Sequence, residues 1–427
     1  MWVRFPPSAL NKVDGSNPFE GAFVCPMKKF ILDFLEFKKS QLISGDKNYL
    51  KFSKENFKLK TVEIKNKKLA LELEKECDKL GRFLTYSEFL NIDQFGEYGY
   101  HKSHKDHGMT GVSNRWPEAI VKLLAKYQIY NMIEFGPGNG KLALKTVKKA
   151  NERGIKIKWS GVEIIDSFRR EIKENFKKHN LYYNLNFISD TLTEIKIQDK
   201  SAAVLSYSLD SIPPDIFLNI RDSTFPTHML GITVKNGILK EILLDKSLLK
   251  RKNITLKKGV YQKNNGVKVN LNNWNLKPYQ RLFLSTLALE NLIGLVNALP
   301  EKSLILIIDE FRVSPPFWEF NHLGVPRDLN TYRRDRFDLD NLYATSGENL
   351  LYYPFYYFSF LNILKQLELD VLKNDEEEKM ANEISGKKSK RGKPSLTYSI
   401  LAIKKIKINK NKIDYFLPNE INYKDKL

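Results

Sequence analysis

A glycine-rich turn near residue 138 limits the folds that this chain can adopt. The segment Ile133-Glu134-Phe135-Gly136-Pro137-Gly138-Asn139-Gly140 places three glycines at alternate positions directly after a short apolar run. Leucine, valine and alanine then recur at helical spacing over residues 141–153. Such a pattern predicts a buried strand that passes through a tight turn into a helix. We therefore expect the first crossover of an α/β fold with a doubly wound sheet.

The turn also predicts a ligand. Glycine permits backbone angles that a Cβ forbids and lets a ligand approach the main chain, while the helix N-terminus offers free N–H groups. A dinucleotide fingerprint would read G-x-G-x-x-G, but Lys141 stands where its third glycine is expected. Glu134, two residues before the first glycine, suits the ammonium group of an amino-acid-bearing cofactor such as S-adenosyl-L-methionine. We predict that Glu134, Gly136, Pro137, Gly138 and Gly140 bind this cofactor; another nucleotide site and a purely structural turn are the alternatives.

Two further carboxylates follow expected strands. Ile155 to Val162 reads as a second strand that ends at Glu163, where a carboxylate would meet ribose hydroxyls. Asn184 to Ser189 reads as a third strand, and Asp190 just past its end could accept a hydrogen bond from an adenine amine. We predict both acids as cofactor-binding residues, with solvated strand ends as the alternative.

Composition excludes several classes of protein. The 427 residues, 42% of them hydrophobic, suit a globular chain of one or two domains. Two cysteines argue against a disulfide scaffold and favour a reducing compartment, and no uncharged apolar stretch reaches membrane-spanning length. The formal net charge of +20 invites a nucleic-acid partner, but the lysines are spread through almost every segment.

Three histidines, His101, His104 and His107, recur at every third residue. The flanking lysines repel cations, and no cysteine or carboxylate cluster accompanies the histidines. We therefore predict a polar loop near the cofactor and no metal site.

The chain divides by pattern into five parts. Residues 1–26 have no regular period, and parts of them back-translate to the T-arm consensus of transfer RNA genes, so we expect a non-native or disordered extension; a genuine flexible arm is the alternative. Further along we expect an N-terminal helical segment (27–127), the first part of a core domain (128–214), an inserted β-rich subdomain on the substrate side (215–279) and the second part of the core (280–427). Within the last part, residues 374–393 have few apolar residues and are expected to be disordered.

The remaining core elements can also be read from the pattern. Ala202 to Tyr207 is expected as a fourth strand, and Leu304 to Ile308 as a buried strand that ends at Asp309. Between them we expect an apolar helix over 280–299, and later an aromatic run over 352–360 that is helix core. A final strand is expected over 396–406.

Three segments resemble one protein family. They are EFGPGNGKLA (134–143), GVEIIDSFRREI (161–172) and SYSLDSIPPD (206–215). Together they resemble the MidA-type, or complex I assembly factor 7-like, S-adenosyl-L-methionine-dependent methyltransferases. The resemblance implies the class I methyltransferase fold, a Rossmann-like sheet with an antiparallel last strand. Mitochondrial members methylate an arginine of a complex I subunit, so the resemblance implies a protein substrate and, more specifically, an arginine side chain.

The chain departs from this family on the acceptor side. The family's asparagine and glutamate after the fourth strand fall on Ser206 and Tyr207, whereas its aspartate is kept as Asp210. We predict Asp210 as the catalytic carboxylate that orients the substrate and Tyr207 as its hydrogen-bonding or stacking neighbour; a loop cap is the alternative for Asp210.

Two other functions stay open. One is an RNA methyltransferase, although the chain lacks an Asn/Asp-Pro-Pro-Tyr motif for a flipped base. The other is a cofactor-binding assembly factor without catalysis. The expected location is the cytoplasm of a bacterium or the mitochondrial matrix of a eukaryote, and no membrane partner is expected.

Overall fold

A computed structural model places most of the chain. It describes residues 58–103, 114–163, 166–181, 185–187, 197–220, 223, 225–264, 266–272, 281–312, 330–331, 343–347, 351–353, 355–386, 397–405 and 412–414. These residues belong to one compact unit, residues 56–418. The expected extension over 1–26, together with Asp190, His104 and His107, lies outside the described residues.

A central sheet carries the fold. Its strand order is β18-β19-β14-β6-β3-β4-β5. The strands are β3 (Asn131–Phe135), β4 (Lys158–Val162), β5 (Leu185–Phe187), β6 (Ser201–Ser206), β14 (Leu304–Arg312), β18 (Leu369–Glu376) and β19 (Thr397–Lys404). The five strands from β5 to β14 are parallel, and β19 runs antiparallel to both of its neighbours. This topology confirms the predicted class I methyltransferase sheet with an antiparallel last strand.

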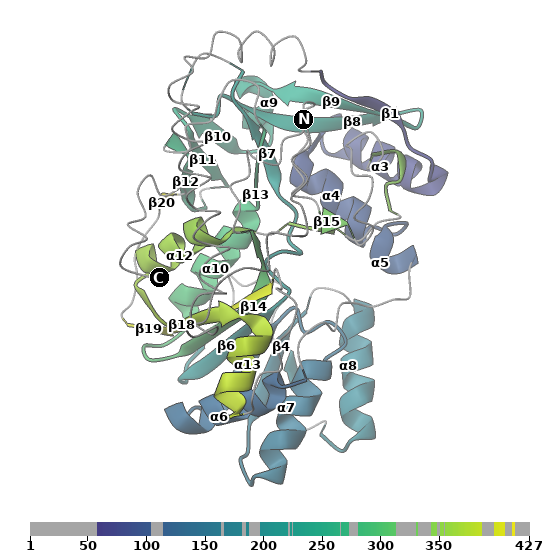
Figure 1. Cartoon of the computed structure of the whole chain (residues 1–427). Helices are drawn as coiled ribbons and strands as arrows, with labels where there is room; N and C mark the ends of the chain where they lie inside the picture. Colours follow the sequence, from purple (N-terminus) through teal and green to yellow (C-terminus); the bar gives the residue numbers. More distant parts are fainter. Residues whose placement is uncertain are drawn as a thin grey trace, which may run out of the picture. The chain divides into compact units, whose positions relative to one another are not determined.

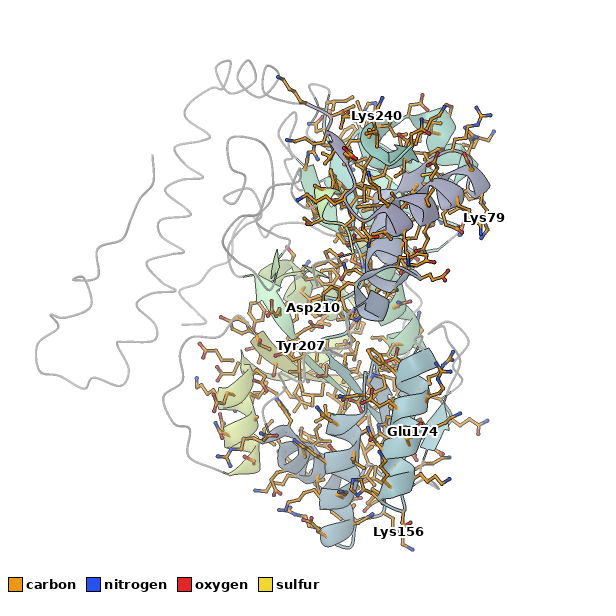
Figure 2. All side chains as sticks on the ribbon, turned by 90° about the vertical axis from the view of Figure 1, so that its right-hand side faces the viewer. Lys79, Lys156, Glu174, Tyr207, Asp210 and Lys240 are labelled. Atoms are coloured by element: carbon orange, nitrogen blue, oxygen red, sulfur yellow. The ribbon has the colours of Figure 1, made fainter. Side chains whose placement is uncertain are left out.

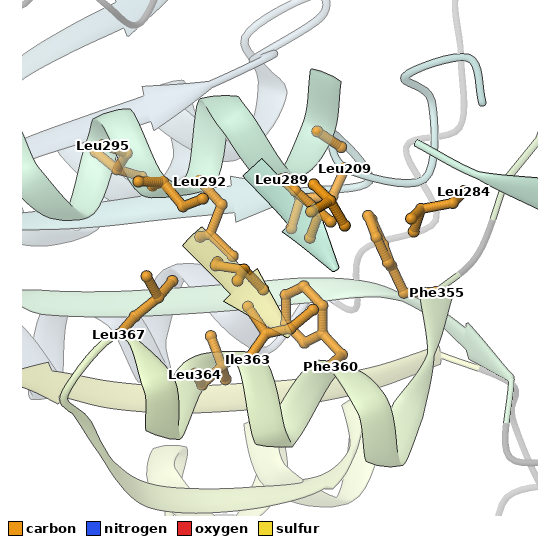
Figure 3. Close-up of a cluster of buried hydrophobic side chains, with 14 of the residues drawn as sticks. Leu209, Leu284, Leu289, Leu292, Leu295, Phe355, Phe360, Ile363, Leu364 and Leu367 are labelled. Carbon is orange, nitrogen blue, oxygen red and sulfur yellow. The ribbon is translucent and has the colours of Figure 1, made fainter. Parts of the chain in front are cut away.

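Helices cover both faces of this sheet because successive strand residues point to opposite sides. Met132 and Val204 pack into a core with α6 (Trp116–Tyr127), α7 (Lys141–Glu152), α8 (Asp166–Lys178) and α13 (Glu377–Ser385) (Figure 1). Ile133 and Leu205 face the other core, with α10 (Thr286–Ala298) and α12 (Tyr357–Gln366). Figure 3 shows apolar side chains of α10 and α12 that meet there. None of the helices in the described part of the chain is long and apolar enough to cross a membrane.

The predicted β-rich insertion contributes strands to two further sheets, which also include strands from outside residues 215–279. A six-stranded sheet has the order β1-β9-β8-β7-β13, with β2 also paired to β8. Its strands are β1 (Thr61–Glu63), β2 (Leu84–Thr85), β7 (Asp215–Leu218), β8 (His228–Lys235), β9 (Ile238–Leu244) and β13 (Arg281–Leu284). A four-stranded sheet joins β10 (Ile254–Lys257), β11 (Val260–Lys263), β12 (Lys268–Asn270) and β20 (Lys412–Asp414).

Smaller elements complete the described fold. They are the helices α3 (Lys67–Lys79), α4 (Tyr86–Phe95), α5 (Tyr100–Ser103) and α9 (Lys246–Arg251), and the strands β15 (Asn330–Thr331), β16 (Leu351–Tyr352) and β17 (Phe355–Tyr356). The aromatic run expected as helix core over 352–360 thus enters α12 only at Tyr357, although its aromatic residues at 353, 355, 357 and 360 are buried.

Two predicted helical regions contain strands. The segment 27–127, expected to be helical, contributes β1 and β2, which pair with β9 and β8. The helix expected over 280–299 begins only at Thr286, because Arg281–Leu284 pairs with β7 and Ser285 caps the helix. Strands of two to four residues are too short to show a hydrophobic period in the sequence. The structure of these regions is therefore determined by pairing with strands elsewhere in the fold.

The expected disorder over residues 374–393 is wrong for residues 374–386; the rest of that segment lies outside the described residues. Residues up to Glu376 continue β18, and residues 377–385 form α13. Met380 and Ala381 are fully buried in the core shared with α6. The indole N–H of Trp116 donates a hydrogen bond to the Glu377 carboxylate at 2.6 Å. A short apolar face suffices here because it packs onto a core that already exists.

Candidate functional site

The glycine turn has the geometry that the sequence predicts. Gly136, Gly138 and Gly140 have φ angles of 61°, 54° and 74°, in the left-handed region that glycine occupies without strain. The Gly136 N–H donates to the carbonyl of Val162 at 2.9 Å and ties the turn to β4. Gly140 is the N-cap residue of α7. The predicted passage from strand to turn to helix is confirmed.

The three glycines differ in what surrounds them. A Cβ on Gly136 would lie 3.2 Å from the Ser208 Cβ, and one on Gly140 would lie 2.9 Å from a side-chain carbon of Ile172. Among the described atoms, a Cβ on Gly138 would meet nothing within 4 Å. Packing therefore accounts for Gly136 and Gly140, whereas Gly138 faces open space. An exposed stretch of backbone before a helix N-terminus fits a cofactor of the predicted kind.

Two acidic residues adjoin this turn. Glu134 is 1% exposed and accepts a hydrogen bond from the Trp159 indole N–H at 3.1 Å. Burial, and to a smaller extent the nearby Glu163 carboxylate, raises the pKa of Glu134 to about 8. The Glu163 carboxylate accepts a hydrogen bond from the Gly138 N–H at 3.1 Å. Glu163 thus supports the turn directly, and both acids lie where a cationic or ribose-bearing ligand could meet them.

Tyr207 and Asp210, both labelled in Figure 2, follow β6, which pairs with β3. Tyr207 has a φ angle of 49°, which is strained for a bulky side chain. Its N–H donates to the carbonyl of Ile308 at 2.8 Å, and its hydroxyl lies 3.2 Å from the Thr397 hydroxyl on β19. Burial, with nearby carboxylates, raises the pKa of Tyr207. Tyr207 is therefore a neutral phenol that already has a hydrogen-bond partner.

Asp210 lies beside Asp309, and both are 1% exposed. The carboxylate of Asp309 accepts hydrogen bonds from the N–H groups of Leu209 and Glu310, each at 3.0 Å. Among the described residues, neither carboxyl oxygen of Asp210 has a hydrogen-bond partner. Burial, together with Asp309, raises the pKa of Asp210, and burial raises that of Asp309 to about 7. An unsatisfied buried carboxyl at the edge of the sheet is a candidate group for orienting a substrate.

The structure brings most predicted site residues to one edge of the sheet. Glu134, the turn glycines, Pro137 and Glu163 lie at the carboxyl ends of β3 and β4, and Tyr207 and Asp210 lie at that of β6. Their assigned roles stay predictions, and Asp190 lies outside the described residues.

The sequence analysis did not pair Asp309 with Asp210, nor did it select Trp159 or Ser208. Asp210 follows β6, and Asp309 lies in the last part of the adjacent parallel strand β14, so strand order alone could have suggested the pair. In the described part of the chain, no three histidine, cysteine or acidic side chains are arranged to hold a metal ion.

Comparison with known proteins independently supports a methyltransferase fold that binds S-adenosyl-L-methionine. Residues 114–312 match a family described as "Putative S-adenosyl-L-methionine-dependent methyltransferase". The C-methyltransferase UbiE of ubiquinone and menaquinone biosynthesis from Rickettsia bellii is 28% identical over 138 residues, which are 31% of this chain and 55% of that protein. The chain thus spans about half the length of this curated relative.

Two crystal structures from Burkholderia thailandensis share the fold. One is an uncharacterised protein with a TM-score of 0.57, and the other is a member of the same superfamily bound to S-adenosyl-homocysteine, with a TM-score of 0.54. Each is 12% identical to this chain and covers 84% of it and 94% of the solved chain. The family match over residues 114–312, the shared fold and the glycine turn agree with one another, and they fit the resemblance of the sequence to the MidA-type S-adenosyl-L-methionine-dependent methyltransferases.

Proposed function

We propose that the chain transfers the methyl group of S-adenosyl-L-methionine to a side chain of a protein, with the arginine guanidinium as the favoured acceptor. The observation that carries this proposal is the buried carboxyl of Asp210, whose oxygens have no hydrogen-bond partner among the described residues. A guanidinium carries five N–H donors and matches a carboxyl that lacks donors. The protein class and the arginine come from the family resemblance described above.

The candidate site has a cofactor side and an acceptor side, each formed by different residues. The cofactor supplies an electrophilic methyl group on a sulfonium sulfur. On the cofactor side, the backbone of Gly138 and the N-terminus of α7 would contact the cofactor. Glu163 holds this backbone in place by accepting a hydrogen bond from the Gly138 N–H. Asp210, in the loop after the neighbouring strand β6, orients the acceptor nitrogen toward the methyl group. Methyl transfer needs mainly alignment of the two groups, so a rigid sheet edge is a suitable support.

The proposed methyl acceptor also defines the binding partner. A protein carrying an exposed arginine would be the substrate, in the bacterial cytoplasm or, in a eukaryote, the mitochondrial matrix. The net charge of +20 would also allow an RNA acceptor.

The test uses the purified full chain, methyl-labelled S-adenosyl-L-methionine and a cell extract. We expect label in macromolecules that protease releases and nuclease does not. Acid hydrolysis should then recover the label as methylated arginine. Asp210→Asn should lose label transfer but keep cofactor binding. Asp370→Asn, an exposed change on β18, is the matched control and should keep both.

Other outcomes point elsewhere. Label released by nuclease would refute a protein acceptor and support an RNA methyltransferase. Retention of labelled cofactor without any transfer would support a cofactor-binding assembly factor. Label in a residue other than arginine would keep the protein acceptor and refute the guanidinium.

A further inference from the structure

The carboxyl groups of Asp210 and Asp309 are both buried and lie close together, since the Leu209 N–H, next to Asp210 in the sequence, donates to the Asp309 carboxylate at 3.0 Å. They come from the carboxyl ends of β6 and β14, which are adjacent parallel strands. Two backbone N–H groups hold Asp309, as described above, but neither donates to Asp210. The Glu310 N–H lies close enough to lower the pKa of Asp210, yet its hydrogen bond goes to Asp309.

An ionised pair would be unfavourable in this environment. Two acceptors without a proton between them repel each other, and burial adds to the cost. Two described neighbours leave the repulsion in place, since the Glu310 carboxylate on β14 adds to it and Tyr207, in the same loop as Asp210, is a neutral phenol. One proton between the two carboxyls would remove the repulsion and give Asp210 a hydrogen bond.

We propose that Asp210 and Asp309 share one proton, carried on Asp210 and donated to Asp309, so that the acceptor side of the site holds one negative charge instead of two. Asp309 is then a positioning residue. Its two N–H contacts fix it, and the shared proton turns one Asp210 oxygen toward it. The other Asp210 oxygen stays available to the methyl acceptor. This role at the acceptor rests on the proposed function.

The singly protonated pair balances the proposed reaction. When a guanidinium nitrogen is methylated, an N–C bond forms, the S–C bond of the sulfonium breaks, and the nitrogen loses one proton. The pair can take that proton and become neutral. The guanidinium, the sulfonium and the pair sum to one positive charge before the transfer. The methylguanidinium, the thioether and the neutral pair sum to the same charge after it.

The proton can be observed directly by NMR. The full chain is labelled at the aspartate side-chain carboxyl carbon, saturated with S-adenosylhomocysteine and titrated from about pH 5 to about pH 10. We expect two carboxyl signals that titrate together and keep one proton at neutral pH. Asp210→Asn and Asp309→Asn should each abolish this joint titration, whereas Asp370→Asn should leave it intact. If one variant does not fold, the other still assigns the signals.

The opposite result is equally clear. If every aspartate carboxyl in the wild-type chain is ionised at neutral pH, the shared proton does not exist. Retention of labelled S-adenosyl-L-methionine is measured on the same samples. Protein that fails to retain it refutes the proposed function, whereas the titration alone decides the proton-sharing pair.

Discussion

Gly138 is the turn residue whose missing side chain leaves a space that no described atom fills. Its neighbours Gly136 and Gly140 are required by Ser208 and Ile172, so their substitution would disturb protein packing first. Of the three glycines, Gly138 is therefore the position where a substitution tests cofactor contact with the least disturbance of protein packing.

We expect Gly138→Val to abolish binding of S-adenosyl-L-methionine, because the new side chain would occupy the open space beside the backbone. The left-handed backbone adds a strain of about 1–2 kcal/mol. Gly154→Val is the matched control, since Gly154 also has a positive φ, of 70°, and open space around its missing Cβ, but lies past the far end of α7. Calorimetric titration with the cofactor checks both variants. Equal loss of affinity in both would mean that backbone strain, not cofactor contact, is responsible.

Glu134 predicts a pH dependence of stability. Its pKa rises from 4.5 to about 8 because burial disfavours the charged form. The folded chain therefore holds a proton that the unfolded chain releases, and the contribution of Glu134 to the free energy of unfolding falls as pH rises from about 4.5 to about 8. Below this range the contribution is fully present.

Glu134→Gln should remove this dependence. Between about pH 5.5 and about pH 8.5, the cofactor-free wild type should lose about 2–3 kcal/mol of unfolding free energy relative to the variant. Urea denaturation of both proteins at the two pH values measures the difference. A wild type that gains stability relative to Glu134→Gln as pH rises would show that Glu134 is stabilised as an anion instead.

At the scale of elements, α13 shows how little apolar surface a helix needs when a core is already present. Met380 and Ala381 pack in the hydrophobic core that also contains buried residues of α6. Near the C-terminus of α13, the Lys122 ammonium donates a hydrogen bond to the carbonyl of Ser385 at 2.7 Å. Charged residues cover the opposite side, which made this stretch resemble a disordered linker in sequence.

We expect Met380→Ala to reduce the free energy of unfolding by about 2–5 kcal/mol, because it removes a fully buried side chain and leaves a cavity. Glu378→Ala, an exposed change on the same helix, should alter it by less than about 0.5 kcal/mol. Chemical denaturation compares the two variants. Identical stability would indicate that α13 does not pack on α6.

Elements with a long period or a fixed motif were predictable. The glycine turn, the strands beside it and the antiparallel last strand followed from residue pattern and family resemblance. β1, β2 and β13 did not, because strands of two to four residues carry no readable period and form through partners far away in sequence. In the site, Asp210 was predictable from its motif. Its pairing with Asp309 depends on strand adjacency, which residue spacing alone does not show.

At the scale of the whole molecule, one buried ion pair connects distant segments. Glu241 on β9 accepts two hydrogen bonds from the Arg281 guanidinium on β13, at 2.7 and 2.9 Å. The same carboxylate accepts from the Tyr343 hydroxyl at 2.6 Å and from the Lys60 N–H at 2.9 Å. These contacts join the segment before the core, the insertion and the chain after β14.

We expect Glu241→Gln to lower the free energy of unfolding by about 3–5 kcal/mol, because Arg281 would remain as a buried cation without its counter-charge. Glu63→Gln breaks an exposed pair with Lys67 and should leave stability unchanged. Thermal and urea unfolding measure both. A mild effect of Glu241→Gln would mean that Tyr343 and Lys60 hold the network without the charge.

Strands from outside the family-matching segment 114–312 pair with β9 and β14 in the two large sheets. β1 covers the edge of β9, and β19 covers the edge of β14. A recombinant fragment trimmed to the matching segment would therefore present two rows of unpaired backbone groups, which favour aggregation. For this protein, the limits of sequence similarity and the limits of an expressible domain are different boundaries.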